Sequence, residues 1–222
     1  MDAPLSVMKV PVTKHALVVG GGVTGLEAAL SIAEQGYPVT LVEKTDKLGG
    51  HALSIKETWQ GEDVSSYVKE LISKLESKEN VNIMTNTTVK KSLGTAGNFV
   101  TTLVQDGKEI ELKHGITIIA TGGEASATEE YLYGKNDKVL LWSELSQKLM
   151  NDPEFAKSIN SAVFIQCVGS RDDQRPYCSN ICCSFSIKTA LEMKKQNPDM
   201  DVYIINRDIR TSGFKELLYR EA

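Results

Sequence analysis

The strongest constraint on the fold of this chain is a glycine pattern near its start. Gly20, Gly22 and Gly25 form G-x-G-x-x-G, directly after the apolar run 16–19 and at the opening of a helix predicted over 23–35. In such a loop the first glycine permits a tight turn, and the second lets the backbone approach a pyrophosphate. The third lets helix and strand pack, while the helix N-terminus attracts phosphate. The pattern predicts a dinucleotide-binding loop.

The residues after this loop complete the local unit. Gly36 ends the helix, and a second strand is predicted over 38–43. Its last residue, Glu43, lies 18 residues after Gly25, about where an acidic side chain accepts hydrogen bonds from a ribose diol. Strand, loop, helix and strand in this order predict a βαβ unit and a parallel sheet. The alternative interpretation is a structural glycine turn with a solvated Glu43.

The pattern that follows predicts a second, antiparallel sheet. An amphipathic helix is expected over 62–78 and a short strand over 81–84. Residues 87–113 then alternate apolar and polar side chains around two turns, which is typical of an antiparallel hairpin or small meander. A further strand over 116–120 runs into Thr-Gly-Gly.

The second half of the chain predicts another βαβ unit. A helix is expected over 143–150, a strand over 162–167, a helix over 180–196 and a strand over 202–205. The fold class expected is α/β: a Rossmann-like domain with a doubly wound parallel sheet and a small antiparallel insert, then an incomplete second Rossmann-like unit. The expected domains are a lead-in at 1–14, the first domain at 15–155 with its insert at about 81–114, and the second domain from 156 to 222.

The four cysteines all lie within one short segment of this second unit. Their spacing is C-x10-C-x3-C-C, formed by Cys167, Cys178, Cys182 and Cys183. It matches neither zinc ribbons nor bacterial ferredoxins, and a thioredoxin-like C-x-x-C is absent. Thiolates suit an iron–sulfur cluster or Zn²⁺, and the charges of Arg171 and Arg175 in the connecting loop could stabilise anionic sulfur. The alternative is that these are buried structural cysteines.

Composition excludes several classes of function. The net charge of −4 and pI of about 5.5 lack the basic footprint of a nucleic-acid binder. No apolar run approaches the roughly 20 residues of a membrane span, and the N-terminus has no signal-peptide pattern, so a cytoplasmic protein without direct membrane insertion is expected. Hydrolase chemistry is disfavoured because no Ser–His–Asp or paired-carboxylate arrangement can be argued.

The first half of the chain resembles the flavoproteins that have two dinucleotide-binding domains. The resemblance rests on the glycine loop with Glu43, on the paired glycines Gly49 and Gly50, and on a strand that ends in Ala-Thr-Gly at 120–122. It implies FAD as the cofactor, with the paired glycines and the Ala-Thr-Gly strand beside the flavin. The residues expected to bind FAD are Gly20, Gly22, Val23, Thr24, Gly25, Glu43, Lys44, Gly49, Gly50, His51, Val89, Ala120, Thr121 and Gly122.

The second half closely resembles the A-type flavoproteins of heterodisulfide reductase, over residues 164–183, 203–210 and 218–222. This resemblance implies a [4Fe–4S] cluster on Cys167, Cys178, Cys182 and Cys183. It also implies an FAD-containing oxidoreductase subunit that relays or bifurcates electrons among the other subunits of such a complex. The relatives most often described carry further ferredoxin-type cysteine runs, which this sequence lacks. Flavoprotein subunits of sulfate-reduction membrane complexes share the same motifs.

Two other functions stay open on the sequence. An NAD(P)H-dependent disulfide reductase would need a second glycine loop and a redox cysteine pair, but only Gly169 follows the strand at 162–167. A zinc-stabilised nucleotide-binding module would use the same four cysteines without redox chemistry. The 222 residues hold only the opening of a second domain, so we expect a fragment, or a subunit completed by another chain, that holds its cofactors poorly.

Overall fold

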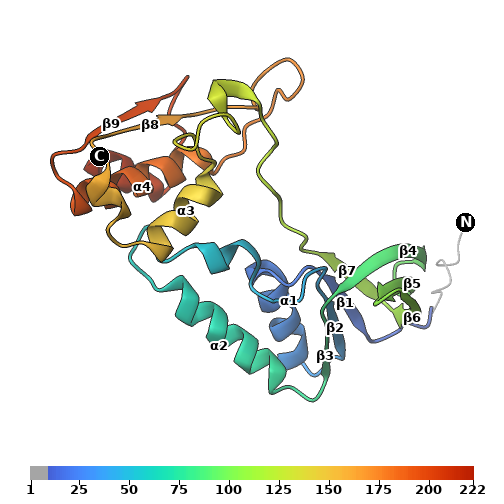
Figure 1. Ribbon diagram of the computed structural model, residues 1–222. Coiled ribbons are helices and arrows are strands. Elements are labelled where there is room, and N and C mark those ends of the chain that lie inside the picture. Colours follow the sequence, from blue (N-terminus) through green and yellow to red (C-terminus); the bar gives the residue numbers. More distant parts are fainter. Residues whose placement is uncertain (1–9) are drawn as a thin grey trace, which may run out of the picture. The chain divides into compact units, whose positions relative to one another are not determined.

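The computed structural model describes residues 10–222 (Figure 1). Of the lead-in expected at 1–14, residues 1–9 lie outside the described residues. The strands are β1 (Ala16–Val19), β2 (Val39–Val42), β3 (Val81–Met84), β4 (Thr87–Thr95), β5 (Asn98–Gln105), β6 (Lys108–His114), β7 (Ile116–Ile119), β8 (Ser161–Ile165) and β9 (Asp201–Ile205). The helices are α1 (Val23–Glu34), α2 (Val64–Glu76), α3 (Trp142–Asn151), α4 (Cys182–Gln196) and α5 (Lys215–Glu221), with short 3₁₀ helices at Gly50–Ser54, Glu130–Leu132 and Phe155–Ser158.

The chain divides into two compact units. The first contains the residues up to Leu53 together with Asp63–Gly123, and the second contains Ser54–Glu62 together with Glu124–Ala222. In the first unit four parallel strands form a sheet in the order β3-β2-β1-β7. This sheet and the antiparallel sheet beside it confirm the expected α/β class.

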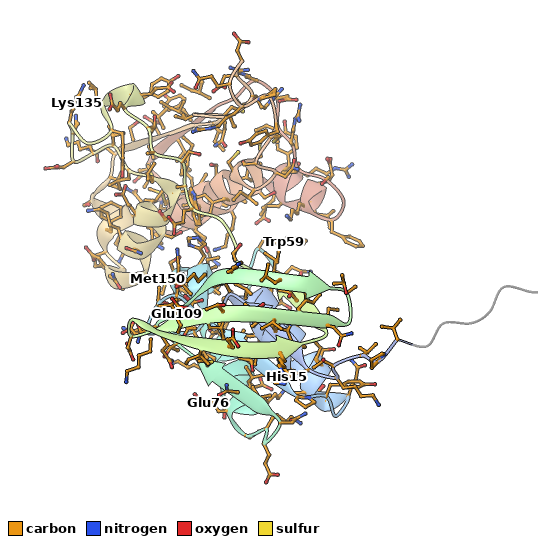
Figure 2. The ribbon with its side chains drawn as sticks, turned by 90° about the vertical axis from the view of Figure 1, so that its right-hand side faces the viewer. His15, Trp59, Glu76, Glu109, Lys135 and Met150 are labelled. Carbon is orange, nitrogen blue, oxygen red and sulfur yellow. The ribbon has the colours of Figure 1, made fainter. Side chains whose placement is uncertain are left out.

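Each face of the parallel sheet is covered by a different layer. Helices α1 and α2 bury their apolar side chains on one face, where Leu26 and Leu75 pack with Val18 and Leu41. On the other face the antiparallel sheet β4-β5-β6 places Leu103 against Leu17 and Val42. Figure 2 shows this sheet in front of the parallel strands, with Glu109 labelled on it. Burial on both faces explains why β1 and β2 are almost wholly apolar.

The antiparallel sheet has the turns that the sequence predicts. Between β5 and β6 the turn residues Asp106 and Gly107 have φ of 50° and 76°. Positive φ at both central residues is the conformation that matches the twist of a two-residue hairpin. Strand β4 carries an irregularity between Val89 and Lys91, where the register with β5 shifts by one residue.

The second unit contains the second βαβ arrangement. Strands β8 and β9 pair in parallel, and α4 connects them. Its core includes Ala156, Met193 and Met200. The strand expected to reach residue 167 ends at Ile165, because Cys167 has a φ of 62°, outside the extended region. In residues 10–222 there is no helix whose length and apolar character would let it cross a membrane.

Candidate functional site

The glycine loop joins β1 to α1, and close backbone contacts require glycine at two of its three glycine positions. A Cβ on Gly20 would lie 2.3 Å from the carbonyl oxygen of Ala120, and a Cβ on Gly25 would lie 1.8 Å from that of Gly20. Both positions are therefore closed to any side chain. A Cβ on Gly22 would meet no atom within 4 Å. Gly22 thus borders open space at the end of the helix, where a phosphate needs close approach to the backbone.

The N-terminus of α1 forms the second part of this cradle. Gly22 is the N-cap residue, and the first intrahelical bond runs from the N–H of Leu26 to the carbonyl of Gly22 at 2.9 Å. The N–H groups of the first turn, including those of Val23 and Thr24, precede that bond and point out of the helix end. Together with the helix dipole, they favour an anion at this place.

Glu43 follows β2 and closes the loop from the other side. Its Oε2 accepts a hydrogen bond from the N–H of Gly21 at 2.7 Å, and its Oε1 accepts two from the N–H and hydroxyl of Thr45, both at 2.9 Å. Burial raises the pKa of Glu43, but these hydrogen bonds and the charge of Lys44 outweigh it and hold the pKa below its usual value. Three of about four acceptor positions on the carboxylate are therefore taken by protein donors.

The paired glycines lie against the glycine loop. The N–H of Gly49 donates to the carbonyl of Gly21 at 2.8 Å, and a parallel bridge joins Gly49 to Gly22. Two residues further on, Nε2 of His51 donates to the carbonyl of Gly123 at 2.5 Å. This segment therefore connects the glycine loop with the residues that follow β7.

The Ala-Thr-Gly segment continues β7 beside the first strand. The N–H of Ala120 donates to the carbonyl of Val19 at 2.8 Å, which brings Thr121 and Gly122 to the same edge of the sheet as the glycine loop. A Cβ on Gly122 would meet no atom within 4 Å, so this segment also borders open space. The contacts thus bring the glycine loop, Glu43, the paired glycines and the Ala-Thr-Gly strand together.

Two of the predicted residues lie less centrally. Strand β4 starts beside Glu43, because the N–H of Thr87 donates to the carbonyl of Glu43 at 2.8 Å, and Val89 follows two residues later with 38% of its surface exposed. Lys44 directly follows Glu43 in the chain.

Residues that present open space, N–H groups and a fixed carboxylate at one sheet edge fit a dinucleotide such as FAD.

The predicted metal ligands lie at the carboxyl end of β8 and the start of α4. Cys167 lies two residues after β8, Cys178 lies in the connecting loop, and Cys182 and Cys183 are the first residues of α4. All four thiols are free, and only Cys183 is buried. Each also has a polar neighbour. Two of these neighbours lie in the loop itself: Asn180 N is 3.3 Å from Cys178 Sγ, and Ser179 Oγ is 3.3 Å from Cys182 Sγ. Arg171 Nη1 is 3.9 Å from Cys167 Sγ. The carbonyl oxygen of Asp208 is 4.0 Å from Cys183 Sγ.

The pKa of the Cys183 thiol is raised above its usual value. Burial raises the pKa of Cys183, and the neighbouring Cys182 and Cys167 raise it further, against a hydrogen bond from the N–H of Arg210. Within residues 10–222, however, no group of three or more His, Cys, Asp or Glu side chains is arranged to hold a metal ion. The donor set therefore fits a soft-metal site in kind, while the described arrangement is not a coordination shell.

Sequence reasoning missed the contacts made by the residues that follow β9. Asp208 pairs with Arg171 and Arg210, and its backbone carbonyl lies beside Cys183. Residues 203–210 belong to the segments that resemble heterodisulfide reductase, but no role follows for Asp208 from that match. The signal that could have found it is topological, because adjacent parallel strands end at the same edge of a sheet. The loops after β8 and β9 must therefore meet.

Known proteins resemble the chain in both sequence and fold. The sequence profile of the family described as pyridine nucleotide-disulphide oxidoreductase matches residues 3–139. The A-type iron-sulfur subunit of the CoB–CoM heterodisulfide reductase of Methanocaldococcus jannaschii is 28% identical over 100% of the chain and 47% of that protein. The A-type subunit of the H₂/formate:CoB–CoM heterodisulfide,ferredoxin reductase of Methanococcus maripaludis is 27% identical over 96% of the chain and 46% of that protein.

The chain therefore spans about half the length of the curated relatives it matches. Among solved structures, L-proline dehydrogenase from P. horikoshii aligns with a TM-score of 0.54 and 22% sequence identity. The alignment covers 93% of this chain and 37% of the dehydrogenase. This likeness agrees with the α/β fold of the chain.

Proposed function

Because this chain belongs to the pyridine nucleotide-disulphide oxidoreductase family, we propose that it binds FAD in its first unit and a [4Fe–4S] cluster in its second, and transfers electrons between them and partner proteins. The two methanogen relatives are subunits of heterodisulfide reductases, and one of them is named for ferredoxin as well. We extend to this chain the role of a subunit that relays or bifurcates electrons in a cytoplasmic complex of that kind.

The observation that carries the FAD proposal is the open space at Gly22. It lies at the N-terminus of α1, next to the fixed carboxylate of Glu43 and the paired glycines. In this proposal the first-turn N–H groups of α1 bind the pyrophosphate, and Glu43 offers its remaining acceptor position to a ribose hydroxyl. Gly20 lets the loop lie close to Ala120 at the end of β7, and Gly25 lets α1 lie close to Gly20, which supports this position for the phosphates.

The flavin end of the proposed site is formed by residues 49–51 and 120–122. Gly50, His51 and Gly122 lie where those segments meet, and the hydrogen bond from His51 to Gly123 holds the segments together. Bound FAD would supply the ability to accept a hydride or single electrons. The protein's part is to orient the cofactor, which backbone contacts on both sides of the site can do.

The proposed cluster ligands are Cys167, Cys178, Cys182 and Cys183. Four thiolates are the ligand set of a [4Fe–4S] cluster, which would supply one-electron transfer. The position of Cys182 and Cys183 side by side at the start of α4 supports this assignment, as does the cation of Arg171 beside Cys167. The N-terminus of α4 adds a positive dipole end at Cys182 and Cys183.

The test is cofactor analysis of the full chain purified without oxygen and reconstituted with FAD, iron and sulfide. We expect about one FAD, about four iron and about four sulfide per chain. A Cys183→Ser variant should lose iron and sulfide while keeping FAD, so that flavin content serves as the internal control.

Other outcomes identify other functions. Zinc at about one per chain without sulfide would point to a zinc-stabilised nucleotide-binding module. Oxidation of NADPH by the iron-free, FAD-loaded chain would point to a disulfide reductase. A chain that takes up neither flavin nor iron under these conditions would exclude the proposal.

A further inference from the structure

The loops after β8 and β9 meet at one edge of the second unit. The two strands pair in parallel with Ile165 opposite Ile205, and the N–H of Gln166 donates to the carbonyl of Ile205 at 2.9 Å. Both segments therefore leave the sheet at the same level and in the same direction. The β8 loop carries Cys167 and Arg171, and the residues after β9 carry Asp208 and two more arginines.

Asp208 lies at the centre of the contacts between these loops. Its Oδ1 accepts a hydrogen bond from Nη1 of Arg171, and its Oδ2 accepts one from Nε of Arg210 at 3.1 Å. The same Nη1 of Arg171 lies 3.9 Å from Sγ of Cys167. The backbone carbonyl of Asp208 lies 4.0 Å from Sγ of Cys183. Asp208 thus contacts one proposed cluster ligand through its backbone and the neighbour of another through its side chain.

Arg171 is the more buried member of its ion pair with Asp208. The Arg171 side chain is 19% exposed, whereas that of Asp208 is 47% exposed. The backbone carbonyl of Arg171 also accepts a hydrogen bond from the guanidinium of Arg207. Because an arginine side chain has many rotamers, a guanidinium keeps one position only where partners fix it. Within residues 10–222, the hydrogen-bond partners of the Arg171 guanidinium are Cys167 and Asp208.

Two pKa shifts agree with this arrangement. The hydrogen bond to Asp208 is the main cause that raises the pKa of Arg171, and the hydrogen bonds from Arg171 and Arg210 lower the pKa of Asp208. Both shifts arise from the contact between the two side chains, and the position of the cation itself is given by the hydrogen bond to Asp208 and the 3.9 Å distance to Cys167 Sγ.

We infer that Asp208 is a positioning residue that holds the Arg171 guanidinium against Cys167, so that this cation favours the reduced, more negative state of the cluster. The inference rests on the proposed function, since it concerns the cluster that Cys167 would help to bind. A fixed positive charge near a cluster raises its reduction potential, because reduction adds negative charge. A guanidinium that is free to turn into solvent loses most of this effect to screening.

The test is a double-mutant cycle on the reconstituted full chain, read out as the cluster's reduction potential. In Arg171→Gln the ratio of reduced to oxidised cluster at a fixed ambient potential should fall about three- to tenfold, where tenfold is about 59 mV for a one-electron couple. The same substitution in an Asp208→Asn background should have less than half that effect, because the guanidinium is already displaced. An Asp173→Asn background, which removes an exposed carboxylate from the same loop, should leave the effect unchanged.

Conservative variants distinguish an effect of the side-chain charge on the potential from an effect of altered folding. Arg171→Lys keeps the cation and should lie closer to the wild-type potential than Arg171→Gln does. Asp208→Glu keeps the carboxylate but lengthens it, and should lower the potential if position matters. Iron content and thermal unfolding are measured for every variant, to show that all potentials come from folded protein with its cluster bound. A variant that loses its cluster is replaced in the cycle by its conservative partner.

The outcomes distinguish this inference from the proposed function. If the wild-type chain takes up no iron, both fail. If it holds the cluster and the Arg171 and Asp208 effects simply add, the positioning role is overturned while the cluster assignment stands. If Asp173→Asn diminishes the Arg171 effect as much as Asp208→Asn does, the effect is one of general loop charge, and the inference is equally overturned. Coupling to Asp208 alone supports it.

Discussion

Gly22 and Gly25 are glycines for different reasons, which separate ligand binding from folding. At Gly25 a Cβ would overlap the carbonyl oxygen of Gly20. At Gly22, with φ of −73° and ψ of 177°, the backbone is extended and a Cβ would meet no atom within 4 Å. Alanine at position 22 is therefore compatible with the fold, but its methyl group occupies the space proposed for the phosphates.

We expect Gly22→Ala to lower the free energy of unfolding by only about 0.5–1 kcal/mol, because Gly22 is the N-cap of α1 and alanine is a poorer N-cap residue. The same variant should weaken FAD binding at least about tenfold, or about 1.4 kcal/mol. Gly25→Ala should cost about 1–3 kcal/mol of stability, because the loop must move to admit the side chain. Urea unfolding and fluorescence titration with FAD measure both effects. Unchanged FAD affinity in Gly22→Ala would show that the pyrophosphate does not bind at this loop.

His114 is a fully buried residue whose protonation state is fixed by its neighbours. Its Nδ1 lies 3.1 Å from the carbonyl oxygen of Ile116, and its Nε2 lies 2.7 Å from the hydroxyl of Thr101. Because a carbonyl only accepts, Nδ1 carries the proton and Nε2 accepts from Thr101. Burial lowers the pKa of His114, and the hydrogen bond to Ile116 opposes that shift only in part. The folded protein therefore disfavours the second proton.

This shift predicts a stability that falls in mild acid. The unfolded chain binds a proton at the ordinary histidine pKa of about 6.5, while the folded chain binds it only at lower pH. The free energy of unfolding should be constant above that pH and decrease below it, by about 1.4 kcal/mol for each pKa unit between the two states. His15, whose pKa is lowered by burial and by His114, acts in the same direction.

Urea unfolding between about pH 8 and pH 5 measures this dependence. His114→Gln should flatten the curve, since glutamine does not titrate, whereas Lys113→Gln, a change at the exposed neighbouring position, should keep the wild-type slope. A His114→Gln curve as steep as that of the wild type would show that other groups cause the acid sensitivity.

At the scale of elements, the sequence predicts what hydrophobic periodicity and turn residues determine locally. The helices expected over 23–35 and 62–78 appear as α1 and α2 with ends that differ by at most two residues, and the strand over 81–84 has the expected bounds. The same reasoning predicts the glycine loop and Glu43 as site residues, because the strand, loop and helix around them are local in sequence.

The features that sequence missed depend on long-range contacts or on exceptional backbone. No periodicity shows that β8 stops at Ile165, since Cys167 adopts a positive φ that a side chain ordinarily avoids. The pairing of Arg171 with Asp208 joins residues 37 positions apart, and follows only from the parallel register of β8 and β9. Helix α5 is short, and nothing in the sequence pattern predicted it.

The position of the glycine loop depends on how α1 packs. Leu26 follows the loop directly and is wholly buried against the parallel sheet. Leu26→Ala should therefore lower the free energy of unfolding by about 2–5 kcal/mol through lost contacts and a cavity. Leu93→Ala, at a position on β4 that is 57% exposed, should change it by less than about 0.5 kcal/mol. Comparable losses in urea unfolding would contradict the core that the structure assigns to α1.

At the scale of the whole molecule, the two proposed cofactor sites belong to different units. The glycine loop, Glu43, the paired glycines and the Ala-Thr-Gly strand lie in the first unit, and the four cysteines with Arg171 and Asp208 lie in the second. Each unit also has its own apolar core. A ligand that binds only one folded unit stabilises that unit by mass action, without requiring any change in the other.

We therefore expect FAD, at about 100 times its dissociation constant, to stabilise the first unit by about 2.7 kcal/mol. Hydrogen exchange measured by mass spectrometry should show slower exchange in peptides from β1, α1 and β2, and unchanged exchange in peptides from β8, α4 and β9. Iron and sulfide loading should give the converse pattern, and Gly22→Ala should weaken only the response to FAD. Protection by FAD that extends equally into β8 and α4 would show that the two units unfold as one cooperative body, and would refute the independence that their separate cores predict.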